Sequence, residues 1–66
     1  MTKQETITLR WTRTGWEAMF TNAPDMGEFE NQWIPTGFTS EAYERMVFDN
    51  IKELNPNSVI LTIPTA

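Results

Sequence analysis

The 66-residue sequence contains neither cysteine nor histidine. The lack of cysteine excludes disulfide frameworks, thiolate nucleophiles and cysteine-ligated zinc or iron–sulfur sites. The lack of histidine removes the usual general base near neutral pH and the commonest metal ligand. Basic residues are also scarce: five Lys and Arg stand against nine Asp and Glu, for a formal net charge of -4. We therefore expect no enzyme, no metal site and no cofactor.

Long hydrophobic runs are absent as well. No apolar stretch has the length of a transmembrane helix, and residues 1–5 lack the apolar region of a secretion signal. We expect a cytoplasmic protein without a membrane partner. The length predicts one domain over residues 1–66 with a thin core. Hydrophobic residues make up 39% of the chain and include three Trp and four Phe, which is enough for folding.

Two segments near the N-terminus, 6–11 and 16–21, alternate between apolar and polar residues, a pattern that predicts half-buried strands. Their apolar positions are Ile7, Leu9, Trp11, Trp16, Ala18 and Phe20. A type I turn closed by Gly15 in the left-handed region would join the two segments as a hairpin. The same register places Trp11 beside Trp16 on one face.

The middle of the chain predicts a short third strand and then a helix. Residues 28–34 are the candidate strand, with Phe29, Asn31 and Trp33 on one side. The helix begins with Thr39 or Ser40 as its cap. It ends at residues 55–57 (Asn-Pro-Asn), because the residue before a proline is disfavoured in a helix. Its expected core stripe consists of Tyr43, Met46, Val47, Ile51 and Leu54. Asn50 falls inside this stripe, so we expect a buried amide tied to backbone in the segment 22–37.

Residues 58–63 form the last predicted strand. They are more uniformly apolar than the first strand, which predicts a better buried or central position. If this strand returns beside the first, the helix is the crossover and the pair is parallel. The predicted fold class is α+β: a three- to four-stranded sheet, in the order β-β-(β)-α-β, with one helix packed on one face.

One helix covers one face of such a sheet, so the other face is open to solvent or to a partner. The alternation assigns eight residues to this open face: Thr6, Thr8, Arg10, Glu17, Met19, Thr21, Ile60 and Thr62. The face is either a solvated threonine surface or a docking surface with Met19 and Ile60 as its apolar centre.

Phe48 lies on the charged side of the predicted helix, which it shares with Glu44 and Lys52. An aromatic side chain among charges is typical of an interface anchor. Alternatively, the loop before the third strand covers Phe48 through Phe29 or Met26.

Charge is distributed unevenly along the chain. Asp25, Glu28 and Glu30 lie in a segment without any base, which either docks a basic partner, such as a nucleic-acid-binding protein, or stays solvated. The N-terminal region holds Lys3, Arg10 and Arg13, which predict an alternative function as a nucleic-acid-binding domain that uses the basic hairpin. The overall acidity opposes direct contact with phosphates.

Four short runs resemble a known family. Residues 15–20 (GWEAMF), 24–27 (PDMG) and 37–42 (GFTSEA), leading to 50–54 (NIKEL), are similar to the N-terminal domain of HicB-type antitoxins. The resemblance implies a β-β-β-α-β type of fold and a protein that blocks a small toxic ribonuclease by direct contact.

The sequence as a whole predicts a non-catalytic, acidic protein-binding module that inhibits or regulates a larger partner protein. Phage-encoded inhibitors of host defence enzymes, toxin neutralisers and minor subunits of complexes are the classes that fit. The expected partner-binding residues are Phe48, Glu44, Lys52, Met19, Ile60, Asp25, Glu28 and Glu30.

Overall fold

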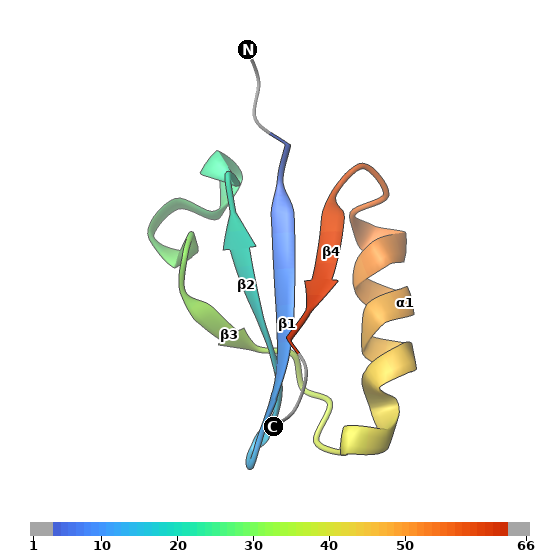
Figure 1. Cartoon of the computed structure of the whole chain (residues 1–66). Helices are drawn as coiled ribbons and strands as arrows, with labels where there is room; N and C mark the ends of the chain where they lie inside the picture. Colours follow the sequence, from blue (N-terminus) through green and yellow to red (C-terminus); the bar gives the residue numbers. More distant parts are fainter. Residues whose placement is uncertain (1–3, 64–66) are drawn as a thin grey trace.

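The computed structural model describes residues 4–63 and contains a four-stranded sheet with the strand order β3-β2-β1-β4 (Figure 1). The strands are β1 (Thr6–Thr12), β2 (Gly15–Thr21), β3 (Trp33–Pro35) and β4 (Val59–Thr62). One α-helix, α1 (Glu44–Leu54), and two short 3-10 helices, η1 (Pro24–Phe29) and η2 (Glu41–Tyr43), complete the described part of the chain. The predicted α+β class and element order are confirmed.

The N-terminal hairpin has the expected register. β1 and β2 are antiparallel, and Trp11 lies opposite Trp16 with 5.7 Å between the ring centroids. Gly15 has a φ of +136°, and a Cβ at this position would lie 2.7 Å from the Phe38 carbonyl oxygen. The same stretch of backbone is bonded to the segment that precedes α1, because the Trp16 amide donates to the Phe38 carbonyl over 2.8 Å. Only glycine satisfies both the backbone angle and this close approach.

The third strand is shorter than predicted. Residues 24–29 form η1 instead, a distorted 3-10 segment that contains Gly27 at a φ of +58°. Phe29 therefore lies in η1 and is exposed, whereas Trp33 is in β3. The proline and glycine of this segment favour tight turns over extended pairing, which explains the difference.

The helix begins and ends where the sequence predicts. Ser40 caps η2, the 3-10 turn that leads into α1, with its Oγ accepting from the Ala42 amide. α1 itself begins at Glu44 and ends at Leu54, before Asn55 and Pro56. Its apolar stripe is only partly buried, because Val47 is fully buried while Leu54 is 71% exposed. Asn50 is also exposed, so its predicted burial is wrong. Of the stripe, only Val47 and Ile51 pack with the core, and Tyr43, Met46 and Leu54 stay exposed.

β4 runs parallel to β1, as the crossover argument predicts, but it is an edge strand and not a central one. Ile60 lies opposite Ile7 and Thr62 opposite Leu9, two residues of the core. Neighbours in register point to the same side of a sheet, so Ile60 and Thr62 lie on the helix-covered face. Their predicted position on the open face is wrong, because the residues of β4 that face outward are one position away from the predicted ones.

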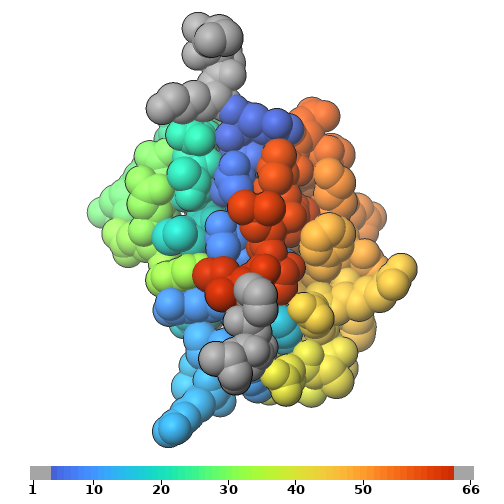
Figure 2. Space-filling view, viewed as in Figure 1, coloured from blue at the N-terminus to red at the C-terminus, as the bar shows by residue number. Residues whose placement is uncertain are grey.

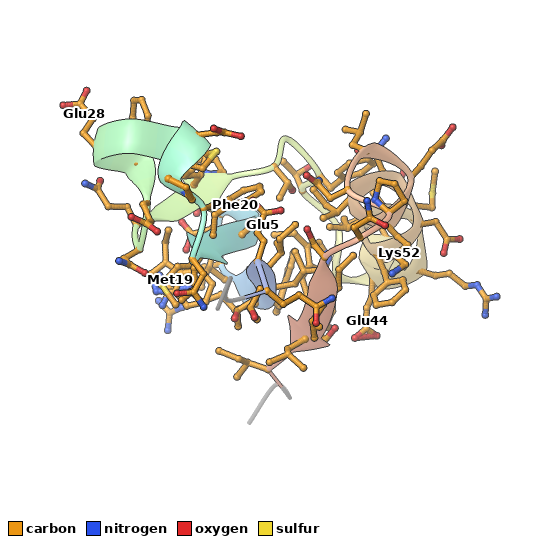
Figure 3. All side chains as sticks on the ribbon, turned by 90° about the horizontal axis from the view of Figure 1, so that it is seen from above. Glu5, Met19, Phe20, Glu28, Glu44 and Lys52 are labelled. Atoms are coloured by element: carbon orange, nitrogen blue, oxygen red, sulfur yellow. The ribbon has the colours of Figure 1, made fainter. Side chains whose placement is uncertain are left out.

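The core lies between the sheet and α1. Its buried members are Ile7, Leu9, Trp16, Ala18 and Val47, and the partly buried side chains of Trp11, Phe20, Phe38, Ile51 and Ile60 pack around them. Both α1 and η1 lie on this side of the sheet, and Phe20 points toward it while Met19 points away (Figure 3). The opposite side of the sheet is covered by neither.

Candidate interaction surface

The open face, the side of the sheet that carries Met19, is more apolar than the sequence predicts. Leu61, Thr8, Met19 and Trp33 lie opposite one another on successive strands and form one row across the sheet. Val59 and Ile63 flank Leu61 at two-residue spacing and so share its side. Leu61 is 52% exposed, and its two neighbours are also exposed. Figure 2 shows the molecule from this side, with β4 in red between β1 in blue and α1 in orange.

A second row on the same face holds Arg10. It lies opposite Glu17, and its Nη2 is 2.7 Å from the Glu17 Oε1. Its guanidinium also stacks on Trp33, with Cζ 3.9 Å from the ring centroid. A cation that is bonded to a carboxylate and lies on an aromatic ring has fewer donors left for a phosphate.

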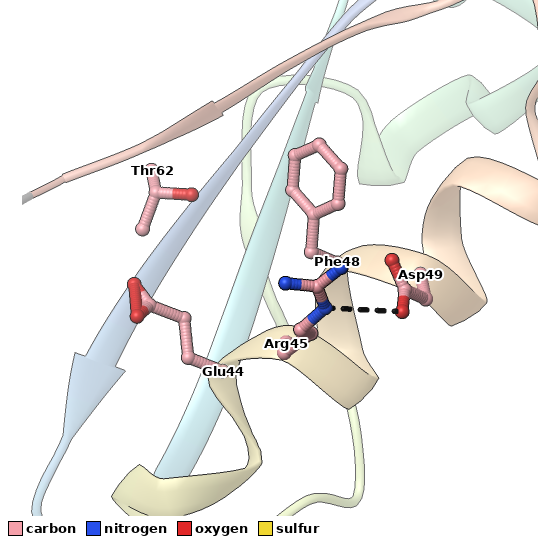
Figure 4. Close-up of a pocket in the computed structure, with 5 residues that line it drawn as sticks. All are labelled: Glu44, Arg45, Phe48, Asp49 and Thr62. Carbon is pink, nitrogen blue, oxygen red and sulfur yellow. Dashed lines mark ion pairs between the residues drawn. The ribbon is translucent and has the colours of Figure 1, made fainter.

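Phe48 borders a hollow between α1 and the edge strand. The hollow has a volume of about 410 Å³ and is lined by Glu44, Arg45, Phe48, Asp49 and Thr62 (Figure 4). Phe48 is 36% exposed. The loop that the sequence offered as its cover lies at the β3 side of the sheet, far from α1 (Figure 1). Phe48 and Glu44, two of the predicted partner-binding residues, are thus brought together beside β4.

Other predicted residues have roles within the fold. Lys52 donates from Nζ to the carbonyls of Pro56 and Ser58, each over 3.3 Å, and so holds the turn between α1 and β4. Glu30 accepts from the Ala23 amide over 2.8 Å and closes the η1 loop. Each of these charges has a partner inside the molecule, which reduces its availability for external contact.

Asp25 and Glu28 are the exposed acids of η1. Figure 3 shows Glu28 at one end of the molecule, with Glu44 and Lys52 at the other. The expected partner-binding residues therefore do not form one cluster. Met19 lies on the open face, Phe48 and Glu44 lie beside β4, Asp25 and Glu28 lie on η1, and Ile60 is in the core.

The residues of the nucleic-acid alternative are dispersed. Arg10 is engaged with Glu17 and Trp33, and Arg13 lies in the exposed turn between β1 and β2. Lys3 lies outside the described residues.

Residues 4–63 contain no group of three or more acidic side chains placed to hold a metal ion. Within the same part of the chain, no helix has the length and apolar character needed to cross a membrane.

The sequence pattern does not identify the residues that make the open face apolar at its edge: Val59, Leu61 and Ile63. A uniformly apolar strand has no period-two signal, so nothing in residues 58–63 indicates which side chains face the helix. The register with β1 decides it. The sequence predicts Trp33 in a strand, but the stacking of Arg10 on its ring depends on strand order, which the sequence pattern does not reveal.

Comparison with known proteins yields no relative. No family model matches this chain, and no curated protein or solved structure matches it.

Proposed function

We propose that this chain is a non-catalytic protein-binding module that acts by direct contact with a larger protein through the open face of its sheet. The observation that carries the proposal is the row of Leu61, Thr8, Met19 and Trp33, continued along β4 by the exposed Val59 and Ile63. Apolar side chains aligned on an uncovered sheet are the usual centre of a protein interface.

The energetic argument rests on β4. Fully burying one exposed leucine, isoleucine or valine side chain contributes about 1.5 to 3 kcal/mol, and roughly half of that remains to be gained at each of Val59, Leu61 and Ile63. The threonines of β1 on the same face, Thr6 and Thr8, provide a polar surround that tolerates water in the free protein. A few apolar anchors with a polar rim are sufficient for a specific interface.

Within this class we propose an inhibitor or regulator. The net charge of -4 and the exposed acids Asp25 and Glu28 favour a partner with a cationic surface, because complementary charge speeds association. Inhibitors of defence enzymes, toxin neutralisers and minor subunits of complexes meet this description. The resemblance to HicB-type antitoxins makes a small toxic ribonuclease the first partner to test.

The test compares two exposed leucines on different surfaces. Leu61→Glu places a charge in the centre of the open face, and Leu54→Glu places the same charge at the end of α1, where the side chain is more exposed still. Both variants and the parent chain are immobilised and exposed to lysate of the native host, and retained proteins are identified by mass spectrometry. We expect a partner that the parent and Leu54→Glu retain and Leu61→Glu loses.

Equal retention by all three chains would contradict the proposal. A steeply salt-dependent gel shift with RNA or DNA, in the absence of any protein that depends on Leu61, would favour the nucleic-acid alternative instead.

A further inference from the structure

The outer edge of β4 has unpaired backbone groups. β4 is the last strand of the order β3-β2-β1-β4, and the amides of Val59 and Ile63 donate toward β1, to the carbonyls of Glu5 and Leu9. In a parallel pair, every second residue of a strand bonds to the neighbouring strand through its N–H and C=O groups. The residues between them, Ile60 and Thr62, therefore point these groups away from β1, toward the free edge. Among residues 4–63, no segment outside the sheet bonds to them.

The two edges of the sheet differ in protection. β3 has three residues and ends at Pro35, and short edge strands with proline resist pairing with another chain. β4 and the residue after it read Val-Ile-Leu-Thr-Ile, without charge or proline. An unprotected apolar edge accepts an added strand, which is a common mode of peptide recognition.

The hollow beside Phe48 lies next to this edge. Thr62 contributes from β4, and the remaining lining residues come from α1, with Glu44 directed toward Thr62 (Figure 4). A residue of an added strand opposite Thr62 points to the same side as Thr62, because paired residues share a face. Its side chain therefore enters the hollow.

The chemistry of the hollow selects a basic side chain. Arg45 faces Asp49 at 3.9 Å, whereas Glu44 takes part in no ion pair within the described part of the chain. Phe48 offers an aromatic surface to the aliphatic part of a lysine or arginine, and Glu44 offers a carboxylate to its charge. A second copy of this chain is a poor occupant, because β4 holds no base and each copy carries a net charge of -4.

We infer that an extended segment of the partner protein adds to the free edge of β4, with a basic side chain in the hollow at Phe48 and Glu44. The next residue of that segment points to the opposite side of the sheet and packs on Leu61. The segment that fits therefore alternates basic and apolar residues. This inference rests on the proposed function, and it specifies how the partner is held and by what chemistry.

The first experiment uses a synthetic probe. A capped peptide of about ten residues, alternating valine and lysine, covers the four residues of β4 with several to spare on each side. It is titrated to millimolar concentration into the ¹⁵N-labelled chain, with an alternating valine and glutamate peptide as control. We expect the amides of Ile60 and Thr62 to shift and to gain protection from hydrogen exchange with the lysine peptide only. No change at these amides overturns the inference.

Two matched pairs of variants test strand addition and the basic side chain in the hollow separately. Thr62→Pro removes an outward N–H without touching the ladder to β1, and Thr62→Val keeps that N–H with a similar shape. We expect Thr62→Pro to abolish binding of the lysine peptide and Thr62→Val to retain it. Glu44→Gln should weaken binding about fivefold, while Glu28→Gln on η1 leaves it unchanged.

If a folded Thr62→Pro chain binds the lysine peptide as tightly as the parent chain, strand addition is overturned. If Glu44→Gln binds it as tightly as the parent, the placement of a basic side chain in the hollow is overturned. If Thr62→Pro does not fold, the exchange data and the Glu44→Gln pair carry the test. Self-association of the parent chain that Thr62→Pro removes would identify a second copy as the occupant and overturn the choice of partner. A host protein whose retention depends on Leu61 but not on the Thr62 amide leaves the proposed function standing and removes only this inference.

Discussion

At the scale of single residues, Gly15 shows how one position joins two parts of the chain. Its backbone closes the β1–β2 hairpin, and the next amide, that of Trp16, is bonded to Phe38. The indole of Trp16 also donates to the Ser40 carbonyl over 3.0 Å, so the segment before α1 is held against the start of β2. The hairpin and the approach to the helix are therefore one unit.

This arrangement predicts the effect of alanine at two glycines. Gly15 and Gly37 both have positive φ, but an added Cβ would meet the Phe38 carbonyl at 2.7 Å only at Gly15. We expect Gly37→Ala to lower the free energy of unfolding by about 1 kcal/mol, and Gly15→Ala by about 3 kcal/mol or more. Urea denaturation measures both. Similar losses for the two variants would show that the close approach at Gly15 is unimportant.

At the scale of elements, α1 is amphipathic in sequence yet buries only part of its apolar side. Val47 is fully buried against the sheet, whereas its neighbour Met46 is 56% exposed. The helix lies beside β4, at the edge of the sheet, so its far flank has no strand beneath it (Figure 1). Exposed apolar residues on α1 are therefore a geometric result of covering a small sheet with one helix.

The same geometry separates two truncations on α1. Val47→Ala removes two methyl groups from the core and should lower the free energy of unfolding by about 2 kcal/mol. Met46→Ala removes more atoms from an exposed position and should change it by less than about 0.5 kcal/mol. Thermal or chemical unfolding followed by circular dichroism gives both values. A larger loss for Met46→Ala would mean that the helix is rotated from its described position.

At the scale of the whole molecule, β1 organises the fold. It pairs with β2 on one side and β4 on the other, and its two core residues, Ile7 and Leu9, are completely buried. The start of β1 is also tied to the start of β4, because Ser58 Oγ donates to Glu5 and the Val59 amide donates to the Glu5 carbonyl. The beginning of the described chain is thereby joined to the turn that leads into its last strand.

This organisation predicts a gradient of hydrogen exchange. We expect the amides of β1 that bond to its neighbours to exchange only through global unfolding, at about 5 kcal/mol for so small a core. The amides of β3, a strand of three residues at an edge, should exchange much faster. Native-state exchange followed by NMR measures both. Slow exchange throughout β3 would contradict an order in which β1 is the central element.

The hairpin register and the start and end of the helical segment follow from local signals: strict alternation, a turn glycine, a capping serine and a proline. The parallel pairing of the last strand follows only if that strand returns beside the first, which no local signal decides. The candidate surface follows from such signals only in part. Phe48 and Glu44 share a helix side by simple periodicity. The sides of the β4 residues cannot be assigned in this way. Residues 59–63 form five consecutive positions without a charge, and such a run carries no information about which side chains face the core.

By itself, the sequence determined the fold class and the absence of the residue types on which most catalysis depends, since both follow from composition and short-range periodicity. Only the tertiary structure decided which strand is at the edge, which side of β4 is exposed and what stands beside Phe48. The physical reason is that strand order and register are set by contacts between residues far apart in the chain. A shift of one residue in that register would place Ile60 on the open face and Leu61 on the core face.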